Sequence, residues 1–371
     1  MGAAAKGRPE QGTAPVGGSA VHAVTSVGAK ILVVKLSSLG DVVHAMPALQ
    51  DIRKALPQAQ IDWVVERGFA PLVRRCAGVG HVIECELRRW RKSAFSAATR
   101  RDWRAFTMDL QQERYDAVID LQGLTKSALV ARLARLAPQG QRFGLAAASE
   151  GSSFEAPARW LVDVAIALPT RIDAESRSRQ LCAQALGYTL PKAISYGLAG
   201  QGGDLQAELE VVPVVPPTRR PCVALIHGSS RADKLWPLTH WLALGARLND
   251  QGYTLALPHG SQQEQREAEV LAAQLEHAIV WPRLDLDAMI DALGTCVGVI
   301  GVDSGLSHLA VALDLLHVQI YNFDTAWRTG PPQTGHQISV YGQPCPTVDA
   351  VWQAWLAATG VLPAAPSPGS R

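Results

Sequence analysis

The sequence lacks the features that mark several common protein classes. It has no C-x-x-C pair and no histidine at zinc spacing, and no apolar run approaches the ~20 residues of a membrane-spanning helix. We therefore interpret its six cysteines as buried thiols of a cytoplasmic protein whose membrane contact, if any, is peripheral. These cysteines are Cys76, Cys85, Cys182, Cys222, Cys296 and Cys345.

Net charge and chain length exclude few further protein classes. The 371 residues carry a net charge of +2 and are 47% hydrophobic, which indicates neither a nucleic-acid protein nor an acidic tail, and which suffices for two cores. The first 29 residues are rich in alanine and glycine and lack the continuous apolar core of a secretory signal, so we expect a disordered tail there.

Short apolar runs alternate with helical patterns, which is typical of βαβ units in a parallel sheet. The predicted helices include 93–113 and 124–136, and the predicted strands are 31–36, 61–66, 81–86, 116–121, 222–226, 253–257, 278–281, 297–302 and 318–321. From 187 to 221 the alternation breaks into glycine- and proline-rich sequence with one strand-like run, 211–215. We therefore predict an α/β chain with a boundary in that segment. The predicted parts are a tail (1–29), a first domain (30–186), a connection (187–221), a second domain (222–346), a C-terminal helical segment (347–360) and a second tail (361–371).

The segment VIGVDSGLSHLAVAL, residues 299–313, ends an apolar strand in a polar elbow and begins a helix. Asp303 ends the strand, Gly305 permits a tight turn, Ser307 can cap the helix, and His308 falls in its first turn. Ligands of parallel sheets bind outside the carboxyl ends of the strands, and a helix N-terminus favours an anion. An ordinary strand-to-helix turn explains this segment equally well.

A matching elbow lies near the other end of the chain. The apolar run 31–36 leads into SSLGD and a helical pattern, so Asp41 falls at the helix start, where it can act as a cap or face a cleft. Two elbows, one in each half, predict two doubly wound domains that face each other across a cleft.

Three other segments carry candidate chemistry. In HGSSRADKLWP, residues 227–237, Ser229, Ser230 and Lys234 can bind a diphosphate, although a surface loop is also plausible. The basic tract LRRWRKSAFSAATRRDWR, residues 87–104, suits an anionic amphiphile or a membrane interface, with nucleic acid or a solvated helix face as alternatives. Its cations are Arg88, Arg89, Arg91, Lys92, Arg100, Arg101 and Arg104.

The third segment is an acidic pair with the spacing of a metal-binding D-x-D motif. Asp285 and Asp287 precede a helical run, and we favour helix capping over metal binding. A dinucleotide fingerprint is absent, because KLSSLGD holds one glycine where G-x-G-x-x-G is required.

Together these segments resemble a known family. KLSSLGDVVHAMPAL, IDWVVERGFAPLV, RRWRK, DLQGLTKSAL, HGSSRADKLWP and VDSGLSHLA occur in the order found in heptosyltransferases of glycosyltransferase family 9, and the resemblance spans roughly residues 30–355. It implies a GT-B fold of two Rossmann-like domains, in which the C-terminal helix (347–360) crosses back to the first domain. It also implies inverting, metal-independent transfer of L-glycero-D-manno-heptose from ADP-heptose to the octulosonic acid of lipid A. The enzyme would need no cofactor and would act at the cytoplasmic face of the inner membrane, without a nucleic-acid partner.

The resemblance also implies roles for individual residues. Asp41 matches the family's general base, and Arg88, Arg89, Arg91 and Lys92 match a segment that meets the anionic acceptor. The positions that match the family's donor-binding residues are Ser229, Ser230, Lys234, Glu264, Leu284, Asp303, Ser304, Gly305 and His308. Leu284 departs from a common methionine, and segment 149–160 departs from the family pattern.

Three alternative functions remain open. A heptosyltransferase that adds a later heptose would share the donor elbow, a sugar-nucleotide epimerase would share the two-domain architecture, and a non-catalytic nucleotide-sugar sensor would not need Asp41. The RRWRK and DWVVERGFA segments favour addition of the first heptose.

Overall fold

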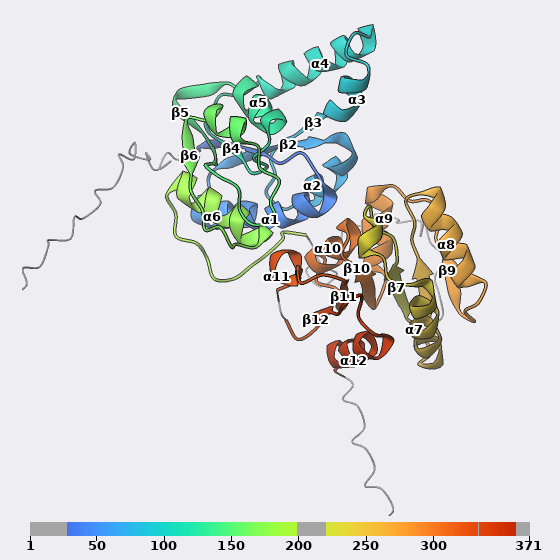
Figure 1. Cartoon of the computed structure of the whole chain (residues 1–371). Coiled ribbons are helices and arrows are strands. Elements are labelled where there is room, and N and C mark those ends of the chain that lie inside the picture. Colours follow the sequence, from blue (N-terminus) through green and yellow to red (C-terminus); the bar gives the residue numbers. More distant parts are fainter. Residues whose placement is uncertain (1–27, 199–219, 333, 361–371) are drawn as a thin grey trace, which may run out of the picture.

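The computed structural model describes residues 28–198, 220–332 and 334–360, which form two α/β units, each built on a six-stranded parallel sheet (Figure 1). The strands of the first sheet are β1 (Lys30–Val34), β2 (Gln60–Glu66), β3 (Val82–Cys85), β4 (Tyr115–Asp120), β5 (Leu136–Leu145) and β6 (Val164–Ile166). Those of the second are β7 (Cys222–Ile226), β8 (Thr254–Leu257), β9 (Ala278–Val280), β10 (Gly298–Val302), β11 (His317–Tyr321) and β12 (Gln337–Tyr341).

Both sheets have the same doubly wound topology. Their strand orders are β3-β2-β1-β4-β5-β6 and β12-β11-β10-β7-β8-β9. In each sheet the strand order reverses between the first strand and the fourth, β1 and β4 in one sheet and β7 and β10 in the other. Ligands of such sheets bind at this switch point, outside the carboxyl ends of the strands. The two predicted elbows follow β1 and β10, which are the strands that flank a switch point in each sheet.

Helices connect the strands. The first unit contains α1 (Leu39–Ala55), α2 (Ala70–Arg75), α3 (Leu87–Lys92), α4 (Ala97–Leu110), α5 (Thr125–Leu133) and α6 (Ala174–Leu186), with 3₁₀ turns at Arg67–Phe69 and Ala156–Trp160. The second contains α7 (Leu238–Asp250), α8 (Gln262–Ala272), α9 (Leu286–Gly294), α10 (Gly305–Ala312), α11 (Ala326–Thr329) and α12 (Val348–Ala358), with a 3₁₀ turn at Ala232–Lys234.

Alternate side chains of each central strand enter different cores. Ile31 and Val33 of β1 join the cluster that contains α1, whereas Leu32 and Val34 pack on the opposite face of the sheet against Phe106 and its neighbours. This period of two is expected for a strand that is buried on both faces. The first of these clusters continues through α1 and α10 into the second unit, so apolar packing joins the two units beside the elbows.

The C-terminal helix differs from the expected crossing toward the first domain. α12 packs on β11, β12 and α7, because Val351, Trp355 and Ala358 are part of the apolar core of the second unit. The contacts between units instead come from α1 with α10, α2 with α9, and α6 with α11.

Several predicted segments have shifted ends or lie outside the description. The helices predicted over 93–113 and 124–136 are shorter, and β5, β6, β12 and α3 were not predicted; β5 contains a proline and two glycines that weaken its strand signal. Most of the tails and of the 187–221 connection, including its strand-like run, lies outside the described residues. Within the described ranges, no helix has both the length and the apolar character needed to cross a membrane.

All six cysteines are free thiols. Cys76, Cys85, Cys182 and Cys296 are buried as predicted, whereas Cys222 and Cys345 are only partly buried.

Candidate active site

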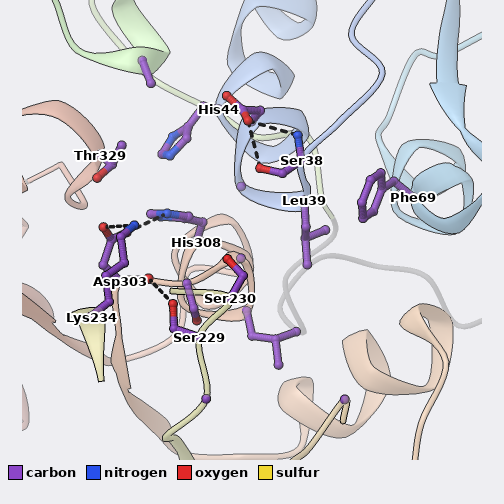
Figure 2. Close-up of a pocket in the computed structure, with 18 of the residues that line it drawn as sticks. Ser38, Leu39, His44, Phe69, Ser229, Ser230, Lys234, Asp303, His308 and Thr329 are labelled. Atoms are coloured by element: carbon purple, nitrogen blue, oxygen red, sulfur yellow. Dashed lines mark hydrogen bonds and ion pairs between the residues drawn. The ribbon is translucent and has the colours of Figure 1, made fainter. Parts of the chain in front are cut away.

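A cavity of about 620 Å³ lies between the two units, at the carboxyl ends of both sheets. Ten of the fourteen predicted site residues line it. Figure 2 shows Lys234 and Asp303 of the second unit across from His44 of the first. The ten are Asp41, Ser229, Ser230, Lys234, Glu264, Leu284, Asp303, Ser304, Gly305 and His308. The two elbows therefore meet in one cavity, as the sequence predicts.

On the first-domain side, Asp41 is both a helix cap and an accessible carboxylate. Its Oδ2 accepts hydrogen bonds from the Ser38 backbone N–H at 3.0 Å and from the Ser38 hydroxyl at 2.8 Å. Its Oδ1 lies 3.6 Å from Lys35 Nζ, and 42% of the side chain remains exposed. Burial raises the pKa of Asp41, but the Lys35 ammonium and the hydrogen bonds from Ser38 outweigh this effect and lower it to about 2. The carboxylate is thus ionised and able to accept a proton.

Lys35 is a buried cation that the sequence analysis did not identify. Besides facing Asp41, its ammonium donates to the Leu121 backbone oxygen at 3.1 Å. Burial lowers the pKa of Lys35, and the carboxylates of Asp41 and Asp120 oppose this shift. Burial also raises the pKa of Asp120 to about 6, against hydrogen bonds from neighbouring donors. The signal was present in the sequence, because Lys35 interrupts an apolar run that forms a buried strand.

On the second-domain side, Asp303 is paired twice. Its Oδ2 lies 2.6 Å from Lys234 Nζ, and its Oδ1 lies 3.3 Å from His308 Nε2. The Asp303 side chain is buried, which raises its pKa, but His308 and Lys234 together hold that pKa well below the usual range. Asp303 is therefore an anion that orients two potential donors at the start of α10 (Figure 2).

The first turns of α1 and α10 approach closely. The rings of His44 and His308 lie 4.5 Å apart between centroids. A Cβ at Gly40 would stand 2.6 Å from the His308 ring, and one at Gly305 would stand 2.9 Å from the Leu39 Cβ. Both glycines are required by this packing, since any side chain would push the two helices apart. Burial and the neighbouring His308 lower the pKa of His44 well below its usual value, so the His44 ring is neutral.

Ser304 caps α10, with its hydroxyl accepting from the Ser307 N–H at 3.5 Å. This corrects the expectation that Ser307 is the cap: Ser307 is buried within the helix, and its hydroxyl donates to the Val302 oxygen at 2.6 Å. At this end of the cavity, the N–H groups of this helix start and the Lys234 ammonium, which is paired with Asp303, are hydrogen-bond donors that suit phosphate.

The loop after β7 completes this end. Ser229 Oγ donates to the Asp303 backbone oxygen at 3.4 Å, and Ser230 follows it on the cavity wall. Glu264 caps α8, with Oε2 accepting from the backbone N–H groups of Gly260 and Ser261 at 2.7 and 3.0 Å. Leu284 lies among apolar neighbours on the same wall. The second-domain half thus offers an anion site beside a partly apolar pocket.

Two arginines that the sequence analysis missed also line the cavity. Arg177 on α6 is buried and donates to Ser149 Oγ at 3.1 Å, and Arg328 on α11 donates to the Gly151 oxygen at 3.0 Å, across the two units. Burial lowers the pKa of Arg177, and Asp41 counteracts this. No local sequence signal marks either residue, because only the tertiary fold brings them to the elbows.

The segment Arg88 to Lys92 lies outside the cavity. Arg88 Nη2 lies 3.4 Å from Ser37 Oγ, next to the first elbow, and Arg89 pairs with Glu86 at 2.7 Å and with Asp102. Arg91 and Lys92 are exposed on α3. The structure thus places Arg88 beside the first elbow, and none of the four cations lines the cavity.

The acidic pair forms a cap and an ion pair. Asp285 accepts from the Ala288 N–H at 2.9 Å, and Asp287 lies 2.7 Å from Arg75 of the other unit. The described residues contain no cluster of three or more histidine, cysteine or acidic side chains arranged to hold a metal ion.

Residues 103–349 match the model of glycosyltransferase family 9 (heptosyltransferase). The chain belongs to glycosyltransferase family 9. It is 38% identical to lipopolysaccharide heptosyltransferase 1 of Pseudomonas aeruginosa over 292 residues, which cover 79% of this chain and 78% of that protein.

Solved structures agree with this assignment. E. coli heptosyltransferase WaaC with ADP matches with a TM-score of 0.75 at 32% identity, over 87% of this chain and 98% of that one. WaaC with ADP-2-deoxy-2-fluoro heptose matches with a TM-score of 0.72 at 35% identity, over the same shares of the two chains. The protein is therefore a glycosyltransferase with the GT-B fold, as the resemblance implied.

Proposed function

We propose that this glycosyltransferase moves L-glycero-D-manno-heptose from ADP-heptose to the octulosonic acid of the lipid A inner core. The observation that carries the proposal is the meeting of an ionised carboxylate, Asp41, with a set of phosphate-binding donors in one cavity between the domains. The 38% identity to a lipopolysaccharide heptosyltransferase 1 supports the choice of donor and acceptor.

The second domain, 222–346, takes the donor. The diphosphate lies against Ser229, Ser230, Lys234 and the start of α10, where N–H groups, hydroxyls and an ammonium face its oxygens. The nucleoside lies toward Leu284 and Glu264, and Asp303 holds the heptose. The ADP complex of WaaC supports a nucleotide-sugar in this half.

The reaction is a single displacement with inversion. Asp41 takes the proton of the acceptor hydroxyl as its oxygen bonds to the anomeric carbon, and the bond from that carbon to the diphosphate oxygen breaks. A positioned base contributes ~10²–10⁴ in rate, and stabilisation of the leaving diphosphate contributes a similar factor. Since Lys234 and the helix start supply this stabilisation, the reaction proceeds without a metal or another cofactor.

The first domain, 30–186, takes the acceptor. The carboxylates and phosphates of the acceptor bind the segment Arg88 to Lys92, whose first residue lies beside the first elbow. Arg177 lies deeper in the cavity, near Asp41. Because the lipid A portion is embedded in a bilayer, the enzyme works as a cytoplasmic protein in peripheral contact with the inner membrane.

The test is a transfer assay with purified protein, ADP-heptose and a heptose-free lipid A core. We expect ADP release that depends on the acceptor, together with one added heptose in the mass spectrum of the product. ADP release without a heptosylated product would contradict the transfer, and conversion of ADP-heptose to an epimer without an acceptor would favour an epimerase.

A further inference from the structure

The helical hairpin formed by α3, residues 93–96 and α4 projects from the edge of the first domain (Figure 1). Three aromatic rings hold its two arms together: Trp90 lies 5.6 Å from Trp103 and 5.5 Å from Phe106, and the last two lie 5.7 Å apart. Trp90 and Phe106 are buried, so the base of the hairpin belongs to the domain core. The hairpin is a fixed projection.

The tip of the hairpin displays a phenylalanine. Phe95 is 93% exposed, the largest exposed fraction among the large apolar side chains described. Its backbone oxygen accepts from Arg100 Nη1 at 2.8 Å, and Ser96 caps α4 through the Thr99 N–H at 3.0 Å. A hydrogen-bonded turn therefore keeps the Phe95 ring exposed to solvent, so burial of this ring contributes nothing to the stability of the fold.

Exposed cations lie on the same hairpin as this ring. Arg100, Arg101 and Arg104 follow one another at helical spacing along the face of α4 opposite its buried residues, and all three are exposed. Met108, 72% exposed, continues the same face, and Lys92 is exposed at the end of α3. The combination of a protruding aromatic ring with several arginines matches the chemistry of an anionic bilayer surface.

We propose that the α3–α4 hairpin is the membrane-docking element of this enzyme, with Phe95 inserted at the boundary between headgroups and acyl chains and the exposed cations of the hairpin on lipid phosphates. The proposal rests on the proposed function, which places the acceptor in a bilayer, and assigns the contact to one surface.

The geometry gives this docking a consequence for catalysis. Arg88, at the start of α3, lies 3.4 Å from Ser37, one residue before the Ser38 that bonds to Asp41. α3 has six residues and is therefore about 9 Å long. When the tip of the hairpin lies on a bilayer, α3 therefore leads from the membrane surface toward Asp41, along the path that the acceptor sugar must span.

Flotation with vesicles of phosphatidylethanolamine and phosphatidylglycerol, free of acceptor, tests the docking. Replacement of Phe95 by Ser should lower vesicle binding about tenfold. The double variant Arg101→Gln, Arg104→Gln should lower it about 25-fold, at roughly fivefold per cation. The matched controls are Trp160→Ser, which removes another exposed aromatic ring, and Lys54→Gln with Arg266→Gln, which removes two exposed charges elsewhere; both should bind as the wild type does.

A second readout separates docking from the reaction. The Phe95 and double-arginine variants should lose transfer to vesicle-embedded acceptor in the same proportion, yet stay within about twofold of wild type on a deacylated, soluble acceptor. Equal vesicle binding by these variants and the controls would overturn the docking proposal. So would wild-type protein that transfers heptose to the soluble acceptor but does not float with anionic vesicles, or that binds duplex DNA through these residues instead. Absence of transfer to either acceptor by the wild type would contradict the proposed function, and flotation would still report on docking.

Discussion

Replacement of Asp41 by Asn isolates the proposed proton transfer, because the two side chains have nearly the same shape. The Asn oxygen can still accept from the Ser38 N–H, so the cap of α1 remains. The change removes proton acceptance and the charge that lies 3.6 Å from Lys35. Loss of a general base should lower kcat by ~10²–10⁴, which corresponds to about 3–5 kcal/mol in activation free energy.

The pH profile sharpens this prediction. A base whose pKa is held near 2 stays ionised at neutral pH, so kcat/KM should show no acid limb from Asp41 above about pH 4. In the ternary complex, the anionic acceptor adds negative charge beside Asp41 and raises its pKa. The acid limb of kcat should therefore lie at higher pH than that of kcat/KM.

The assay is initial-rate ADP release with both substrates, supported by circular dichroism and by calorimetric titration with ADP. Donor affinity and the folded signal should match those of the wild type. A variant with near-normal kcat would refute the assignment and reduce Asp41 to a helix cap.

Four further outcomes are expected. Lys234→Ala and Asp303→Ala should each impair use of ADP-heptose, because each breaks a 2.6 Å buried ion pair; wild-type donor kinetics in both would contradict the donor site. Gln at all three arginines of segment 88–92 should raise the acceptor KM with little change in donor affinity and should weaken inhibition by salt; unchanged values would assign the segment to a solvated face. EDTA should leave activity intact, and loss that magnesium restores would contradict metal independence. Asp120 has a pKa raised to about 6, so the stability of about 3 kcal/mol that its protonated form contributes is lost as pH rises from about 4 through 6. The melting temperature of Asp120→Asn should therefore depend less on pH over that range than that of the wild type.

Local patterns account for what the sequence could predict. The two polar elbows that contain Asp41 and Asp303 each follow an apolar run and are signals contained in a few residues, and both residues line the cavity. The capping role of Asp285 was equally local and is confirmed. The shift of the α10 cap from Ser307 to Ser304 is a small error of the kind expected at helix ends.

Features that depend on tertiary contacts could not be predicted in this way. Arg177 reaches the site only because α6 packs beside α1, and Arg328 reaches it only across the two units. α12 stays on the second unit because Trp355 fills a gap in its core, which its amphipathic pattern alone does not specify. The basic tract carried a charge signal, but its shape as a projecting hairpin depends on three aromatic contacts.

The central claim is transfer of the first heptose to the inner core, and competition between two acceptors tests it most directly. The wild-type enzyme receives ADP-heptose with equal amounts of heptose-free lipid A core and of the same core already carrying one heptose, and mass spectrometry follows both. We expect the heptose-free core to gain a single heptose while the heptosylated core stays unchanged. Growth of the heptosylated core alone would contradict the account and identify a transferase for a later heptose.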